Sequence, residues 1–87
     1  MAMMQTEHPH IQRDALGRAL VGDTGLEVHI LAAYWRLGWT PEQLAEAYPY
    51  LSMAQIFSAL SFYFDHQQEV DALIAANRGE ATVAAAQ

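Results

Sequence analysis

Apolar residues recur at helical spacing near the middle of the chain. Over residues 27–38 they follow an i, i+3, i+4, i+7 pattern, made by Val28, Leu31, Ala32 and Trp35. This spacing is typical of a helix that buries one face. Gly38 stands where a helix commonly ends in a left-handed residue. The pattern therefore predicts a first helix over residues 27–38.

A capping signal predicts a second helix over residues 40–48. Thr40 can accept a hydrogen bond from the backbone of Gln43, and the Gln43 side chain can return one, which is the capping-box spacing. Pro41 suits the first helical position. Pro49 ends the helix, because the residue before a proline avoids the α region.

The same capping-box spacing recurs at Ser52 and Gln55, ahead of the longest apolar stretch. It predicts a third helix that runs from Met53 to about Asn77. Helix, turn and helix then follow one another as in a helix-turn-helix unit. At 100° per residue the expected core face consists of Met53, Ile56, Phe57, Leu60, Tyr63 and Phe64.

The later part of this third helix departs from that face. Phe62 projects to nearly the opposite side. A new stripe, displaced by roughly 90°, is formed by Val70, Leu73 and Ile74. A helix with two apolar faces usually packs on two surfaces. We therefore expect its far half to leave the chain's own core and meet a second molecule, with a homodimer partner as the first choice.

Short β-like segments precede the helices. His10–Arg13 and Arg18–Val21 can pair across a loop that contains Asp14 and Gly17. A two-stranded ribbon is marginal alone in water, so it has to lie on the helices. The predicted fold is mainly α, a three-helix, helix-turn-helix-like domain with a short N-terminal β-hairpin and a long C-terminal helix.

The predicted organisation is one domain between two flexible ends. Residues 1–9 would form a flexible N-terminus and residues 79–87 a flexible tail. The domain would span residues 10–78, with the ribbon over 10–26 and the helices over 27–78. A chain of 87 residues leaves little room for a second domain.

Composition limits the classes of function. The chain has no cysteine, which excludes disulfides and thiolate metal sites and suits a reducing cytoplasm. Its longest apolar runs are too short to span a bilayer, so we expect a cytoplasmic protein with no membrane partner. Four arginines and no lysine face ten carboxylates, for a formal charge of −6. This balance disfavours nucleic acid and favours a basic protein partner.

A polar cluster follows the apolar run, at Asp65, His66 and Glu69. At i, i+3 and i+4 spacing these side chains share a helix surface and could ligate a divalent metal. Such a site needs a ligand from another element, and only His8 and His10, in the N-terminus expected to be flexible, offer one. We therefore interpret the trio as a solvated helix face and expect no metal and no cofactor. Without a nucleophile elbow or a Gly-rich phosphate loop, catalysis is not expected either.

A longer motif spans the second and third predicted helices. It begins with Gly-x-Thr-Pro-Glu at the start of the second helix and continues with Tyr-Pro-x-Leu in the turn. The third helix then carries Ala-Leu, a Tyr, the pair Asp-His, a Glu and an Asp. The residues are Gly38, Thr40, Pro41, Glu42, Tyr48, Pro49, Leu51, Ala59, Leu60, Tyr63, Asp65, His66, Glu69 and Asp71. By this motif the chain resembles domain-of-unknown-function family 433 (DUF433) over roughly residues 10–76.

This family in turn resembles the antitoxin half of VapBC-type toxin–antitoxin modules. The resemblance implies a small non-enzymatic protein that dimerises, binds a PIN-type ribonuclease toxin and masks its active site. Helix surface would make the contacts to the toxin or within the dimer. The residues expected in these contacts are Phe62, Val70, Leu73, Ile74 and Arg78.

Two other functions remain open. A structural adaptor dimer is one, and a helix-turn-helix transcriptional regulator, possibly of its own operon, is the other. A regulator would read base edges with the third helix and contact phosphates from the ribbon. The residues expected to touch DNA are Arg13, Arg18, Ser52, Met53, Gln55 and Ser58. The third helix has no Arg or Lys between residues 53 and 60, which weakens this alternative.

Overall fold

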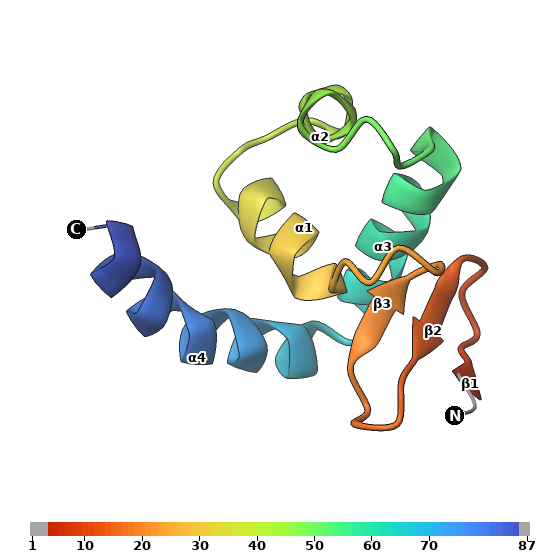
Figure 1. Ribbon diagram of the computed structural model, residues 1–87, viewed down its shortest axis with the longest axis horizontal. Helices are drawn as coiled ribbons and strands as arrows, with labels where there is room; N and C mark the ends of the chain where they lie inside the picture. Colours follow the sequence, from red (N-terminus) through yellow and green to blue (C-terminus); the bar gives the residue numbers. More distant parts are fainter. Residues whose placement is uncertain (1–3, 86–87) are drawn as a thin grey trace.

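The computed structural model describes the backbone of residues 4–85 and the side chains of residues 4–77. Three short strands precede four helices (Figure 1). The strands are β1 (Met4–Gln5), β2 (Ile11–Arg13) and β3 (Ala19–Val21). The helices are α1 (Val28–Arg36), α2 (Pro41–Ala47), α3 (Met53–Asp65) and α4 (Gln67–Ala85). The architecture therefore combines helices with a small antiparallel sheet.

The predicted β-hairpin is confirmed. Strands β2 and β3 pair antiparallel, with Ile11 opposite Val21 and Arg13 opposite Ala19. The carboxylate of Asp14 organises the loop by accepting hydrogen bonds from the backbone N–H groups of Leu16 and Arg18. Every residue of β3 is buried, because this strand lies against the helices. The ribbon is thus held by packing, as a two-stranded unit requires.

Residues 4–9, which the sequence placed in a flexible N-terminus, are part of the fold. Met4 and Gln5 form β1, which pairs antiparallel with β2 and makes a third strand of the sheet. The Thr6 hydroxyl donates to the carbonyl of Ile11 over 2.8 Å and accepts from the backbone N–H of His8. The chain between β1 and β2 is therefore a structured turn.

Capping residues set the helix boundaries as predicted. In α2 the Thr40 hydroxyl accepts from Gln43 N at 3.1 Å, and Thr40 N donates to Gln43 Oε1 at 2.8 Å. Ser52 and Gln55 form the same two bonds at the start of α3. Gly38 follows α1 with φ of 100°, a conformation that favours glycine. In Figure 1 α2 is seen end-on, whereas α3 lies closer to the plane of the view, so the two helices cross steeply.

The long C-terminal helix predicted from Met53 to about Asn77 is wrong, because the helix breaks at His66. His66 has φ of −127° and ψ of 43°, outside the helical region, and ends α3. The chain then turns, so that α4 lies against α1. This break places Val70 and Ile74 in the chain's own core, with 2% and 8% of their surfaces exposed. The bend between α3 and α4 thus buries Val70 and Ile74 of the displaced stripe within the chain itself.

The core of α3 also differs from the predicted face. Its buried residues are Ile56, Ala59, Leu60, Phe62 and Tyr63. Phe62 is fully buried, and its ring lies against His8, Arg13 and His66. Met53, Phe57 and Phe64, predicted as core, are exposed instead. Among the described residues no helix has both the length and the hydrophobicity needed to cross a membrane.

Candidate functional site

The main candidate site is a stripe of exposed apolar side chains along α3. Met53, Phe57 and Phe64 expose 38%, 52% and 52% of their surfaces, and we call these three residues the outer stripe. At 100° per residue they fall within about 40° of one another around the helix axis. Isolated exposed apolar residues are ordinary on protein surfaces, but an aligned set marks a contact surface.

The outer stripe continues onto α1 through an aromatic contact. The rings of Phe64 and Trp35 meet edge to face, with centroids 6.1 Å apart. Tyr50, in the turn before α3, is also 59% exposed and packs edge to face on Tyr48. Rigid aromatic side chains of this kind are enriched where proteins bind one another.

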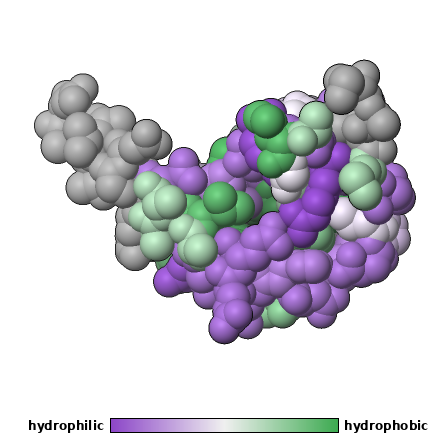
Figure 2. Space-filling model, turned by 90° about the horizontal axis from the view of Figure 1, so that it is seen from below, coloured by the Kyte–Doolittle hydropathy of each residue, from purple (hydrophilic) through white to green (hydrophobic). Residues whose placement is uncertain are grey.

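The residues predicted to meet a partner are mostly in the interior. Phe62, Val70 and Ile74 are buried within the chain, so the expectation that they face a second molecule is corrected. Leu73 keeps 37% of its surface exposed. Its neighbours Ala72, Ala75 and Ala76 on α4 are also exposed. The face of the molecule seen in Figure 2 carries a hydrophobic patch next to a larger hydrophilic surface. The side chain of Arg78 lies outside the described residues.

The arginines predicted to touch DNA are held by carboxylates of the same chain. Arg13 makes two bonds with Glu69, at 2.7 and 3.0 Å. Arg18 Nη2 lies 2.6 Å from Asp14 Oδ2, and Arg18 also approaches Glu27. Both side chains would have to leave these pairs to reach a phosphate.

The polar residues predicted to read bases are also occupied. Ser52 and Gln55 bond to each other's backbone in the capping box. Ser58 is half-buried, while Met53 is exposed and belongs to the outer stripe. The exposed face of α3 therefore offers mainly apolar surface.

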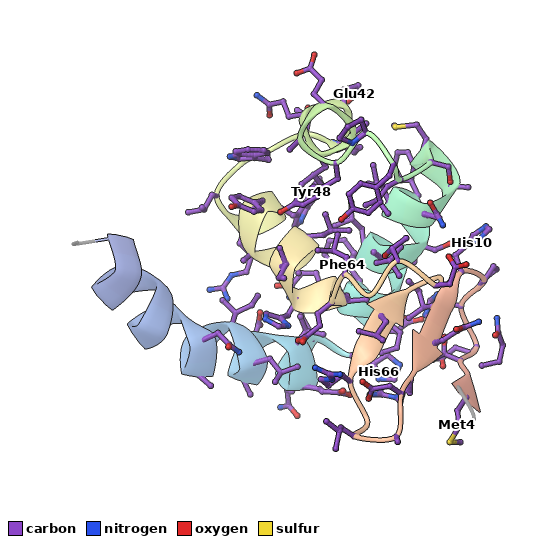
Figure 3. The ribbon with its side chains drawn as sticks, in the orientation of Figure 1. Met4, His10, Glu42, Tyr48, Phe64 and His66 are labelled. Carbon is purple, nitrogen blue, oxygen red and sulfur yellow. The ribbon has the colours of Figure 1, made fainter. Side chains whose placement is uncertain are left out.

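The trio Asp65, His66 and Glu69 is not a simple solvated face, because residues near the N-terminus contact all three side chains. His8 Nε2 lies 2.7 Å from Asp65 Oδ2, and His66 Nε2 lies 2.8 Å from Glu7 Oε2. Glu69 binds Arg13 as described above. Figure 3 shows His66 beside the sheet at the start of α4, whereas His10 lies at the other end of β2.

Phe62 lies beneath this polar cluster. Its ring stacks on His66 with centroids 4.2 Å apart, and His8 meets it edge-on at 5.8 Å. The Arg13 guanidinium lies 5.2 Å from the centre of the same ring. His8 was named from the sequence as a possible further ligand, but its contact with Asp65 and the contact of Glu7 with His66 were not predicted, because these partners are 57 or more residues apart.

Electrostatics around the cluster favour the charged forms of Glu7 and Glu69. The hydrogen bond from Arg13 lowers the pKa of Glu69, and the nearby charge of Arg13 adds to this effect. A backbone hydrogen bond and the bond to His66 lower the pKa of Glu7. On α3, burial raises the pKa of Tyr63, whose hydroxyl donates to Asp71 over 2.9 Å.

A groove of about 420 Å³ lies between α1 and α4. Its walls are mostly apolar, with His29, Arg36 and Asn77 at polar positions. Arg36 is paired with Asp71 across these helices at 3.2 Å. The groove therefore contains no free cation among its described residues, and its chemistry suits an apolar contact.

A comparison with known protein families shows which family the chain belongs to. A family model described as "Protein of unknown function (DUF433)" matches residues 14–63, more than half of the sequence. The chain belongs to the DUF433 family. No curated protein and no solved structure matched it. The DUF433 match includes Met53 and Phe57 of the outer stripe, but it ends before Asp65 and His66.

Proposed function

We propose that this DUF433 protein is a non-enzymatic, antitoxin-type binding protein that docks on a PIN-type ribonuclease and masks its active site. The observation that carries the proposal is the outer stripe on α3. Burying a phenylalanine side chain contributes about 1.5–3 kcal/mol, so Phe57 and Phe64 together can supply a large part of a specific affinity. The helix-turn-helix-like arrangement of α2 and α3 presents this stripe as a helix face, a recurring mode of protein recognition.

Charge supports a basic partner. The formal charge is −6, and the three arginines whose side chains the structure describes are all paired with carboxylates of the same chain. Glu42 and Glu46, on the exposed side of α2, add negative charge. A nuclease that binds RNA phosphates carries a basic surface, which is complementary to this field.

A homodimer is part of the proposal. Leu73 and the exposed alanines of α4 form a second apolar surface, separate from the outer stripe. A second copy of the chain could cover this surface while α3 remains open to the nuclease. A structural adaptor dimer would use the same α4 surface without any nuclease.

The DNA-binding alternative has less support. Its strongest feature is the succession of α2, a short turn and α3, which DNA-reading helix-turn-helix units share. Against it stand the paired arginines and the apolar outer face of α3. A gel shift at low salt with the DNA upstream of its own gene separates the two functions, and retardation there would favour the regulator.

The proposal is tested with a PIN-type ribonuclease from the same organism. We expect the purified chain to inhibit RNA cleavage by this enzyme stoichiometrically. The double variant Phe57→Gln, Phe64→Gln should need at least about 100-fold more protein, because each lost anchor contributes about 1.4 kcal/mol or more and each 1.4 kcal/mol is a factor of ten. Leu16→Gln is the matched control, since Leu16 is 79% exposed in the hairpin loop and far in sequence from the stripe. Equal inhibition by the double variant and by wild type would refute the proposed surface.

A further inference from the structure

Three potential metal ligands meet where the N-terminal turn contacts the end of α3. They are Glu7 and His8, in the turn after β1, and Asp65, the last residue of α3. One ligand atom from each lies within 4.8 Å of the other two. Histidine nitrogen with carboxylate oxygens is a donor set that suits Zn²⁺ and similar divalent transition metals.

The spacing of these atoms is close to that of a metal site. Ligands at about 2.0–2.1 Å from a tetrahedral zinc ion lie about 3.4 Å from one another. His8 Nε2 is 2.7 Å from Asp65 Oδ2 and 3.8 Å from Glu7 Oε2, on either side of that value. The carboxylate oxygens of Glu7 and Asp65 lie within 4.8 Å of each other, so these two side chains would have to close by up to about 1.4 Å to complete a coordination shell.

The ligands are supported by neighbouring groups. The His8 side chain is only 13% exposed, is packed on Phe62, and follows the Thr6 turn that bonds its backbone N–H. His66 Nε2 lies 2.8 Å from Glu7 Oε2, so it can hold that carboxylate in place as metal-site partners do.

Charge in the cluster also suits a dication. The carboxylates of Glu7 and Asp65 are 58% and 61% exposed, which leaves an approach from solvent. Arg13 lies near the same ring of Phe62, but Glu69 holds its guanidinium through two bonds. Two carboxylates and a neutral imidazole would balance the charge of one divalent ion.

We propose that Glu7, His8 and Asp65 bind one divalent transition-metal ion such as Zn²⁺, with His66 positioning Glu7. The ion fastens the N-terminal turn to the junction between α3 and α4. Because its ligands are 57 residues apart along the chain, binding stabilises the folded state over the unfolded one. This site is independent of the outer stripe, so it stands or fails separately from the proposed nuclease binding.

The test is calorimetric titration of the full-length, untagged, metal-free protein with zinc chloride. We expect saturable binding of one ion per chain and a rise in melting temperature that excess chelator reverses. His8→Ala and Asp65→Asn should each weaken binding at least about 100-fold, and His66→Gln about 10–100-fold. Cobalt chloride, with its visible absorption, reports directly whether the bound ion has a low coordination number.

His10→Asn is the matched control. His10 is an exposed histidine with φ of 71°, a conformation that asparagine tolerates, and it lies away from the cluster (Figure 3). This variant should bind zinc as wild type does. Circular dichroism checks that each variant folds. If His8→Ala does not fold, the zinc affinity of Asp65→Asn decides the test. Absence of one-to-one binding, wild-type affinity in Asp65→Asn, or an equal loss in His10→Asn would overturn the site.

Discussion

Phe57 and Phe62 stand five residues apart on α3 and lie in opposite environments. Phe62 is fully buried, between the sheet and the ring of His66. Phe57 exposes 52% of its surface. At 100° per residue the two side chains point about 140° apart. Neighbouring elements cover only part of the circumference of α3, so Phe62 is buried and Phe57 is exposed.

This contrast predicts different costs of truncation. Phe62→Ala should lower the free energy of unfolding by about 3–5 kcal/mol, because it leaves a cavity under the polar cluster. Phe57→Ala should cost less than about 1 kcal/mol, because its side chain is half in water already. Urea denaturation followed by circular dichroism measures both, and Phe62→Leu serves if the alanine variant does not fold. Equal costs for the two positions would contradict the assignment of Phe62 to the core.

The pair of Arg13 and Glu69 predicts a pH dependence. The Arg13 hydrogen bond lowers the pKa of Glu69 in the folded chain relative to the unfolded one. Its stabilisation is therefore fully present above the unfolded pKa of about 4.3 and is lost as pH falls through the lower folded pKa. The neighbouring His66 Nδ1, at 3.7 Å, acts on Glu69 in the same direction when protonated.

Glu69→Gln tests this dependence. Because the Glu69 side chain is 40% exposed, the pair contributes only about 0.5–1 kcal/mol at neutral pH. The stability difference between wild type and Glu69→Gln should shrink as the pH falls below about pH 4. Urea titrations across this range measure it, with Glu46→Gln on α2 as the control. A difference that grows as the pH falls below about pH 4 would contradict the sign.

At the scale of elements, local capping and tertiary packing act on different helix ends. The starts of α2 and α3 follow from Thr40, Gln43, Ser52 and Gln55, whose bonds are local, and the sequence predicted both. The end of α3 at His66 has no proline or glycine to mark it. It follows from the packing of Val70 and Ile74 on the rest of the chain, which no local pattern contains.

The caps themselves make a prediction. Ser52→Ala removes the acceptor for Gln55 N at the start of α3 and should cost about 1 kcal/mol of stability. Ser52→Asp, which keeps an acceptor and adds favourable charge at the helix start, should restore most of the loss. Thermal melts of the three proteins measure the effect. No change in Ser52→Ala would show that α3 is held by packing alone.

The candidate sites were predictable only in part, because they too depend on packing between elements that are distant in the sequence. Asp65, His66 and Glu69 were singled out from their spacing, but Glu7 and His8 join them only because β1 extends the sheet. The outer stripe was read as core because α3 is apolar on most of its circumference. Periodicity identifies apolar faces, whereas neighbouring elements decide which of them are covered.

At the scale of the whole molecule, the fold leaves two apolar surfaces on an acidic body. Helix α4 packs on α1 and buries most of the residues first expected to meet a partner, so we propose that the partner contact lies on the outer stripe of α3. Leu73 is the only residue of the predicted contact set that stays exposed among those whose side chains the structure describes. The central claim is that a second protein covers Phe57 and Phe64.

Light scattering coupled to size-exclusion chromatography tests this claim most directly, on the 9.7 kDa chain mixed with a PIN-type ribonuclease from the same organism. We predict one species that contains both proteins for wild type and for Leu16→Gln. The double variant Phe57→Gln, Phe64→Gln should elute apart from the nuclease while its own fold and self-association stay unchanged. Wild-type protein that elutes separately from the nuclease, or a double variant that still forms the complex, would contradict the account.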